Sequence, residues 1–287
     1  EHSVEELWEE IKEGRLQTAV VPDDDGAVNA RPSTPFLTLV MISDTHCELG
    51  KMIDQNLIPP GDVLIHAGDI TVHGDEQNLI KFNEELGRLP HPHKLVISGN
   101  HELGFDPEED VSRKKCEGTG TPEGWKLLTN CTFLHDSSTV ACDSSRCQID
   151  GVTFYGASWH PLEGYPFYRP REQLREKWER IPDDVDVVIT HSPPIGPFTL
   201  WIGMIFIRNR SGYLDVYPHS TPPERWGCRY LLERVEKLRP FLHVFGHTHD
   251  CYGAVTNGHT LFVNAASSTV TKGRFNRPLV AYIPKKI

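Results

Sequence analysis

The amino-acid sequence predicts an α/β protein with mixed sheets. Three runs in its first third are almost continuously apolar, which is typical of strands buried on both faces: FLTLVMIS (36–43), DVLIHAG (62–68) and HKLVISG (93–99). Each run ends in polar residues, and helical patterns alternate with the strands along the chain. The 287 residues, 38% of them hydrophobic, can bury a sizeable core in one large domain or two small ones.

The remaining elements follow in order. A helical pattern over 75–89 separates the second strand from the third, and two further helices are expected over 171–181 and 228–238. The strands expected in the second half cover 132–136, 138–142, 148–158, 184–191, 241–247, 253–267 and 278–284. We expect these elements to form one domain over residues 36–287.

The first 35 residues are predicted to be separable from that domain. SVEELWEEIKEGRL has apolar residues at helical spacing, with Ser3 as its N-cap and Glu6 as the capping-box partner. VPDDDGAVNARPSTP, which follows, is typical of a polar linker. We interpret residues 1–35 as a docking helix with its linker, which gives the protein a surface for a protein partner.

Polar side chains of the kinds that bind metals follow five of the apolar runs. In α/β sheets, ligands gather beyond the carboxyl ends of the strands, so these side chains are expected to converge. They are Asp44, His46, Asp69, Asn100, His101, His191, His247 and His249. One such motif alone is more often an ordinary loop, but five of them at successive strand ends are hard to produce by chance.

The chemistry of this set indicates a dinuclear metal centre. Carboxylate, imidazole and amide ligands without a thiolate favour Mn, Fe, Zn, Co or Ni over a zinc–cysteine site. The set is too large for one tetrahedral ion and suits two ions about 3.5–4 Å apart that share a carboxylate, as in enzymes that attack phosphorus in line. Residues two apart in an extended segment project to the same side, so Asp44 with His46, and His247 with His249, can reach one cavity.

The net charge of −11 argues against a protein held on extended nucleic acid by a basic surface. Metal ions would instead supply the positive charge that a phosphate ligand needs. The longest apolar run, LWIGMIFI (200–207), is too short to span a bilayer, which takes roughly 20 residues.

The expected compartment is the cytoplasm. No secretory h-region is visible near the start of the sequence, although a chain that begins with Glu leaves a removed leader as the alternative. None of the seven cysteines forms a C-x-x-C pair, which fits free thiols in a reducing compartment. Cys142 and Cys147 could close a hairpin disulfide if the protein is secreted.

Taken together, the motifs resemble the calcineurin-like metallophosphoesterase superfamily. Its pattern D-x-H, G-D, G-N-H-[DE], H and G-H-x-H is matched by Asp44–His46, Gly68–Asp69, Gly99–Glu102, His191 and Gly246–His249. Within the superfamily, ISDTH, GDVLIHAGD, KLVISGNHE, THSPP, GCRYLLERV and RPFLHVFGHTH resemble the metallophosphoesterase-domain-containing branch related to class III cyclic nucleotide phosphodiesterases. The match runs from Phe36 to about Pro284 and leaves out the first 35 residues.

The resemblance implies a four-layer α/β/β/α sandwich with two mixed sheets and two divalent ions, with manganese expected. The implied ligands are Asp44, His46 and His249 for the first ion, Asn100, His191 and His247 for the second, and Asp69 as the bridge. Some members of the branch lose the first His of G-H-x-H and become poor catalysts, whereas this chain keeps it. The second ion is therefore expected to be retained.

The expected reaction is attack on phosphorus by a hydroxide that bridges the two ions. The resemblance places His101 near the leaving group, where it is the candidate general acid. Electrostatic positioning alone is the alternative role for this histidine. Asp69, as the shared carboxylate, is the residue whose loss should be most damaging.

Substrate contacts are expected from Asn100 and His101 and from the aromatic loop ASWHPLEGYPFYRP (157–170). Trp159 and His160 of this loop could stack a base, with Arg169 on the phosphate. A packed surface loop is the equally weighted alternative. Glu102 and Asp250 are candidates for orienting the metal-bound histidines, with a solvated surface role as the equally weighted alternative.

A stretch over 197–226 looks longer than the branch usually carries and has no counterpart in the family pattern. Its apolar part, LWIGMIFI, could be a lid, a surface for a protein partner, or core.

The function predicted from these observations is a phosphodiesterase for cyclic nucleotides or other small phosphodiesters. A phosphomonoesterase, pyrophosphatase or protein phosphatase is the first alternative, but it would need extra basic groups beside the metals, and the sequence shows no obvious cluster of them. A nucleotide-binding scaffold with weak turnover is the second.

Overall fold

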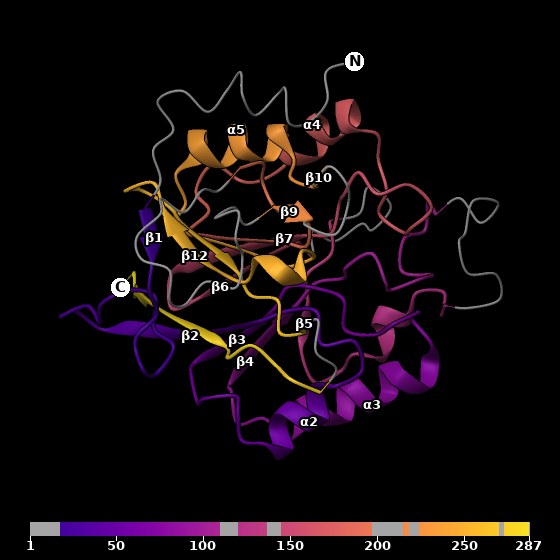
Figure 1. Cartoon of the computed structure of the whole chain (residues 1–287), viewed down its shortest axis with the longest axis horizontal. Coiled ribbons are helices and arrows are strands. Elements are labelled where there is room, and N and C mark those ends of the chain that lie inside the picture. Colours follow the sequence, from indigo (N-terminus) through magenta and orange to yellow (C-terminus); the bar gives the residue numbers. More distant parts are fainter. Residues whose placement is uncertain are drawn as a thin grey trace.

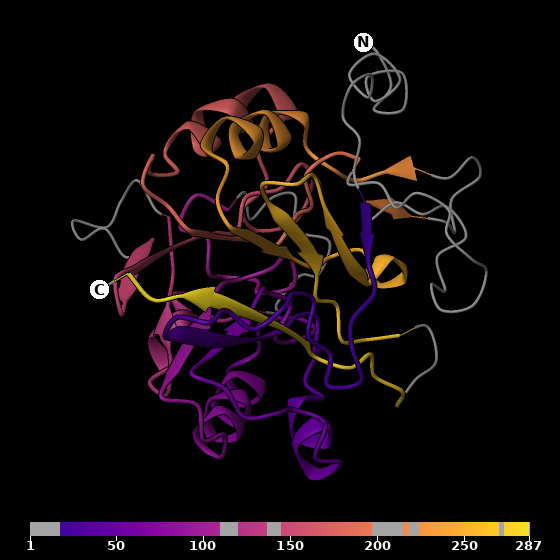
Figure 2. The same cartoon turned by 90° about the vertical axis from the view of Figure 1, so that its left-hand side faces the viewer.

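The computed structural model describes residues 18–109, 120–136, 145–196, 215–217, 224–269 and 273–286. Two β-sheets lie face to face, and pairs of helices cover their outer faces (Figure 1). Figure 2, turned by 90°, shows the same sequence of layers, with helices at the top and bottom and the sheets between them. The predicted four-layer α/β/β/α sandwich with two mixed sheets is confirmed.

The five-stranded sheet contains the first three predicted strands. Its strands, in spatial order, are β14 (Leu279–Pro284), β2 (Phe36–Ile42), β3 (Val63–His66), β4 (His93–Val96) and β5 (Thr132–Phe133). β2 to β5 run parallel, and β14 is antiparallel to β2 at the edge. Helices α2 (Leu49–Asp54) and α3 (Glu76–Gly87) cover its outer face (Figure 1).

The seven-stranded sheet is built from the second half of the chain, with one exception. Its strands, in spatial order, are β1 (Thr18–Val20), β12 (Gly253–Thr256), β13 (Leu261–Asn264), β11 (Leu242–Phe245), β8 (Val187–Thr190), β7 (Val152–Ala157) and β6 (Arg146–Ile149). β13, β11, β8 and β7 are parallel, β12 and β6 are antiparallel to them, and β1 is antiparallel to β12. Helices α4 (Arg171–Glu179) and α5 (Arg229–Leu238) cover its outer face (Figure 1).

Three small elements complete the described residues. The hairpin of β9 (Val216–Tyr217) and β10 (Glu224–Arg225) stands apart from both sheets. The 3₁₀ helices are η2 (Gly124–Leu127) and η3 (His249–Cys251).

The central strands are buried on both faces, as their apolar sequences predict. In β2, Leu39 and Met41 belong to the hydrophobic cluster that joins the two sheets, whereas Val40 and Ile42 belong to the cluster beneath the helices. Successive side chains of a strand point to opposite faces, so a strand between a helix layer and a second sheet needs apolar residues at every position. The same reason explains the continuous runs in β3, β8 and β11, all of whose residues are buried.

The expectation of a separable segment before Phe36 is corrected for residues 18–28. β1 pairs antiparallel with β12, and the Val28 N–H donates to the Val280 carbonyl at 2.8 Å. Ala27 and Val28 are buried. The exposed edge of β12 offers unpaired backbone groups, and β1 satisfies them, which a polarity pattern alone does not reveal.

Several predicted segments lie outside the described residues. They are the docking helix within 1–17, the strand over 138–142 and most of the 197–226 stretch, of which 215–217 and 224–226 are described. In the described part of the chain, no helix has both the length and the apolarity to cross a membrane. Among the described cysteines, Cys47, Cys131, Cys147 and Cys228 are free thiols, and Cys142 is outside the described residues.

Candidate metal centre

The predicted ligands lie where the two sheets meet at one edge. β2, β3 and β4 of one sheet and β8 and β11 of the other each end just before one of them. The sheets are bonded together there, since the Ser267 N–H donates to the Ser43 carbonyl at 2.8 Å. Each sheet therefore supplies part of the candidate site.

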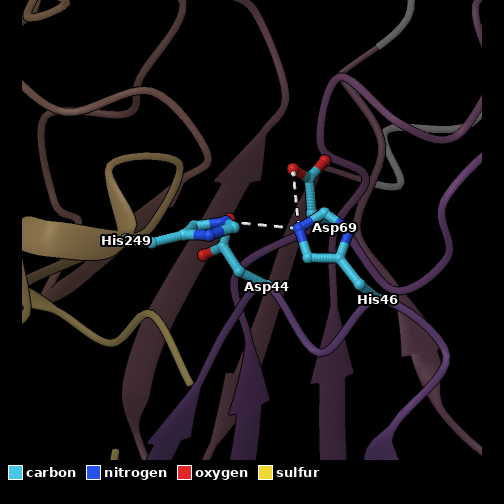
Figure 3. A group of neighbouring side chains, drawn as sticks. All are labelled: Asp44, His46, Asp69 and His249. Atoms are coloured by element: carbon cyan, nitrogen blue, oxygen red, sulfur yellow. Dashed lines mark hydrogen bonds and ion pairs between the residues drawn. The ribbon is translucent and has the colours of Figure 1, made fainter. Parts of the chain in front are cut away.

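The first group of side chains consists of Asp44, His46, Asp69 and His249, and its ligand atoms all lie within 4.8 Å of one another (Figure 3). His249 Nε2 lies 3.2 Å from Asp44 Oδ1 and 3.2 Å from His46 Nε2. His46 Nε2 lies 3.8 Å from Asp69 Oδ2. This is the set of residues predicted for the first ion and the bridge.

The second group consists of Asp69, His191 and His247, so Asp69 belongs to both. His191 Nε2 lies 3.4 Å from Asp69 Oδ2 and 3.2 Å from His247 Nδ1. Asn100 adds its amide oxygen, Oδ1, at 3.0 Å from His191 Nε2. These four residues are the ones predicted for the second ion and the bridge.

The hydrogen bonds of the imidazoles show which ring nitrogens face the cluster and can bind a cation. His46 Nδ1 lies 3.0 Å from the Thr71 carbonyl and His191 Nδ1 lies 2.9 Å from the Ala67 carbonyl. Carbonyls only accept, so each Nδ1 donates and each Nε2 of a neutral ring directs its lone pair into the cluster. Lone pairs that converge with carboxylate oxygens fit divalent metal ions, as the sequence predicts.

The charges in the cluster point the same way. Burial would lower the pKa of His191, but the carboxylates of Asp69 and Asp44 raise it to about 9. Burial would raise the pKa of Asp44, but its hydrogen bond with His249 lowers that pKa to about 2. Burial would also raise the pKa of Asp69, but the charges of His191 and His101 hold it well below its usual range. Both carboxylates are thus ionised in a buried place, where a bound cation would be strongly favoured.

His101 lies on the more open side of the cluster. Its side chain is 29% exposed, whereas that of Asp69 is 3% exposed, and its Nε2 lies 4.0 Å from Asp69 Oδ2. Its Nδ1 donates to the Val72 carbonyl at 2.7 Å, which leaves Nε2 for the cluster. The ring packs edge-on against His46, with 4.9 Å between centroids. This position lets Nε2 reach a substrate that enters from solvent.

The backbone turns sharply at the candidate ligands. Asp44, His46, Asp69 and His247 all have left-handed φ values, of 54°, 42°, 54° and 69°. Such values are uncommon outside glycine, and Asp and His are among the residues found there more often. The turns bring the side chains back over the ends of the strands that precede them.

Residues 37–251 match the family model described as calcineurin-like phosphoesterase. The chain belongs to this family. A UPF0046 protein of Caenorhabditis elegans is 46% identical over 98% of this chain and 88% of its own length. Metallophosphoesterase domain-containing protein 1 of Homo sapiens is 38% identical over 96% of this chain and 79% of its own length. The family implies metal-dependent hydrolysis of phosphoesters.

In this phosphoesterase, Glu102 braces the loops that carry the ligands. Its carboxylate accepts hydrogen bonds from the N–H groups of Gly99 (2.7 Å), Asp69 (3.1 Å) and Thr71 (2.9 Å) and from the Thr71 hydroxyl (3.1 Å). Burial and the charge of Asp69 raise the pKa of Glu102 to about 7, against the effect of the N–H bonds. Glu102 thus fixes backbone, while the carbonyls of Thr71 and Ala67 orient His46 and His191.

We expect Glu102→Gln to weaken metal binding about 10- to 100-fold, the usual effect of losing a group that orients ligands. The side-chain NH₂ group of Gln would face the backbone N–H of Asp69 or of Thr71. Two donors cannot form a hydrogen bond, so that backbone segment would be displaced. Competition with a chromophoric chelator measures the affinity. Glu76→Gln on the exposed start of α3 is the control, and equal affinities in the two variants would contradict the bracing role.

Gly246 allows β11 to pass close to the loop after β2. A Cβ at this position would clash with Ser43 Oγ and with Asp44 Oδ2. We therefore expect Gly246→Ala to displace Asp44 and to lower the affinity for one ion by about 10- to 100-fold. Elemental analysis of the dialysed protein measures the loss. Gly258→Ala, which has open space around it and a φ of 86°, controls for a general loss of stability.

The aromatic loop packs mainly against its own surroundings. Trp159 is 3% exposed, and its Nε1 donates to Asp136 at 2.8 Å. The Arg169 guanidinium lies over the Trp159 ring at 4.7 Å and pairs with Asp106 at 3.3 Å. The packed-loop alternative fits these two residues better than base stacking and phosphate contact do.

Three rings next to the cluster complete the site. His160, a predicted substrate contact, is buried, donates through Nε2 to the Pro166 carbonyl at 2.6 Å and stacks on His247 at 6.4 Å. Tyr165 lies 5.9 Å from the His101 ring and Trp226 lies 4.9 Å from the His247 ring. The sequence offered Tyr165 as one of the aromatic residues of the 157–170 loop that could stack a base. No pattern pointed toward Trp226.

Proposed function

We propose that this phosphoesterase is a phosphodiesterase that hydrolyses cyclic nucleotides or other small phosphodiesters with two divalent ions, manganese being expected and Fe, Zn, Co and Ni also compatible with the ligands. The observation that carries the proposal is the pair of ligand groups that share Asp69 beside the more open His101. Two closely spaced ions are the arrangement that suits in-line displacement at phosphorus.

The charge around the cluster supports a diester. Within the described ranges, no lysine or arginine forms a hydrogen bond or ion pair with a candidate ligand or with His101. A monoester carries about one more negative charge than a diester at neutral pH, and enzymes that prefer it place extra cationic groups beside the phosphate. Among the described residues, a cluster with imidazoles and no lysine or arginine bound to it suits the singly charged diester.

The chain's residues have distinct roles in this proposal. Asp44, His46 and His249 would hold one ion, Asn100, His191 and His247 the other, and Asp69 both. The bound ions supply an activated water and positive charge for the phosphoryl oxygens. His101 would give a proton from Nε2 to the leaving oxygen, while the Val72 carbonyl holds Nδ1 and so keeps Nε2 directed at the substrate.

A substrate panel under Mn²⁺ tests the function. It contains 2′,3′- and 3′,5′-cyclic nucleotides, bis(p-nitrophenyl) phosphate, p-nitrophenyl phosphate and a phosphopeptide, each with and without EDTA. Metal-dependent cleavage of a diester in preference to the monoester is the expected result. Cleavage of monoesters alone would replace the proposal with a phosphatase, and bound metal without turnover would replace it with a nucleotide-binding scaffold.

A further inference from the structure

The β9–β10 hairpin, which neither sheet includes, presents an aromatic side chain to the candidate metal centre. Its strands pair Val216 with Arg225, and the N–H of the next residue, Trp226, donates to the Asp215 carbonyl at 2.9 Å. Asp215 and Arg225 form an ion pair at 2.8 Å, with side chains 0% and 1% exposed. Either charge would be costly to bury alone, so Asp215 and Arg225 stay together and the end of the hairpin is fixed at this pair.

The residues after Trp226 are fastened to the loop that carries His191. The Cys228 N–H donates to the Pro193 carbonyl at 3.0 Å, and the Ile195 N–H donates to the Cys228 carbonyl at 3.1 Å. Between them, Gly227 leaves no room for a Cβ, which would lie 2.6 Å from the Pro194 carbonyl oxygen. Trp226 is therefore held from both sides in the chain, and its backbone position is fixed relative to the second ligand group.

The Trp226 ring lies against the cluster, and the residue is partly exposed. Its centroid lies 4.9 Å from that of His247, with 43° between the ring planes, and the residue is half-buried. A flat apolar ring that is partly accessible therefore lies directly beside the second ligand group.

We propose that Trp226 is a specificity-determining residue, which contacts the ester group that stays on phosphorus and favours a flat aromatic group there, such as a nucleobase or an aryl ring. This inference rests on the proposed phosphodiesterase function. His101, on the leaving-group side, packs against His46 of the first ligand group, whereas Trp226 packs against His247 of the second. The two residues thus lie against different halves of the cluster, one for each ester group of a diester.

Two diesters with the same leaving group test this role. Hydrolysis of bis(p-nitrophenyl) phosphate and of methyl p-nitrophenyl phosphate adds water to phosphorus and breaks the bond to p-nitrophenolate. The products that remain are p-nitrophenyl phosphate and methyl phosphate. Stacking of one ring on an aromatic side chain changes binding by roughly five- to a hundredfold. We expect Trp226→Leu to raise KM for the aryl diester about tenfold and for the methyl diester less than twofold, and Trp226→Phe to restore most of the loss.

Binding and metal content provide readouts that do not depend on turnover. Calorimetry with the metal-loaded protein should show that Trp226→Leu weakens the binding of p-nitrophenyl phosphate about tenfold. The binding of methyl phosphate should be unchanged. The number of ions per chain should stay as in the wild type. Tyr165→Leu is the comparison variant: it lies beside His101, so it should alter both diesters alike, since they share a leaving group.

Equal losses with both diesters, or a loss of bound metal in Trp226→Leu, would overturn the inference and make Trp226 a support for His247. Failure of the wild type to cleave any diester, these two and those of the substrate panel alike, would instead overturn the proposed function. The two failures are therefore distinguishable.

Discussion

Replacing Asp69 by Asn should lower kcat/KM by at least about a thousandfold. In the described part of the chain, Asp69 is the one residue that belongs to both ligand groups. A neutral amide offers one oxygen where two cations need a shared negative charge. A thousandfold decrease in kcat/KM corresponds to a loss of several kcal/mol in the stabilisation of the transition state. The variant should also retain fewer than two ions per chain.

The substitution also leaves enough of the structure in place for the test to be clear. Asp69 Oδ1 accepts a hydrogen bond from the His101 N–H at 3.0 Å, and the amide oxygen of Asn can keep it. Asp54→Asn removes a carboxylate of equal size from an exposed ion pair with Arg88 and should turn over like the wild type. Wild-type turnover by a purified Asp69→Asn protein with two bound ions would exclude the bridging role.

Replacing His101 by Asn should lower kcat about 10²- to 10⁴-fold while both ions stay bound, if the histidine is the general acid. The size of the loss should depend on the leaving group. A p-nitrophenolate needs little protonation as it departs, whereas a phenolate needs more. The effect of the substitution should therefore be larger with diphenyl phosphate than with bis(p-nitrophenyl) phosphate.

This comparison separates proton donation from simple electrostatic positioning. A positioning role predicts the same loss for both diesters, because the charge on the phosphoryl oxygens is similar. His259→Asn, in the exposed turn between β12 and β13, is the matched control for the loss of an imidazole. Equal losses with the two diesters would leave His101 as an electrostatic group only.

The ligand set was predictable because each ligand comes directly after a buried strand in the sequence. Asp44, Asp69 and His191 each follow a buried strand within a few residues, and the parallel order of the strands brings their ends to one edge. The pairs D-x-H and G-H-x-H then needed only a short turn to place both side chains in one cluster. None of this depends on side-chain packing, which sequence patterns describe poorly.

The surroundings of the cluster were less predictable for the same physical reason. The composition of the 157–170 loop suggested stacking on Trp159, but its neighbours Asp136 and Asp106 engage Trp159 and Arg169 in the fold. Glu102 was a candidate for orienting a histidine or for a solvated surface role, and it instead lies buried and binds backbone N–H groups. Partners far apart in the sequence decide these roles.

Several short elements escaped prediction, and β1 and α2 are examples that are too short to carry a periodic pattern. β1 has three residues and forms only because the edge of β12 is open to it, and α2 has six. The long helices α3, α4 and α5, with their full apolar stripes, were predicted to within a few residues.

The left-handed backbone conformation of Asp44, His46, Asp69 and His247 serves metal binding at a cost in folding stability. For a residue with a Cβ, this conformation costs roughly 1–2 kcal/mol compared with the right-handed one, and glycine would avoid most of that cost. A laboratory selection for heat resistance alone, without substrate or metal, would therefore not protect these four side chains from replacement. Variants that lost them would have no means of holding the ions, so a screen of this enzyme must assay turnover alongside thermal tolerance.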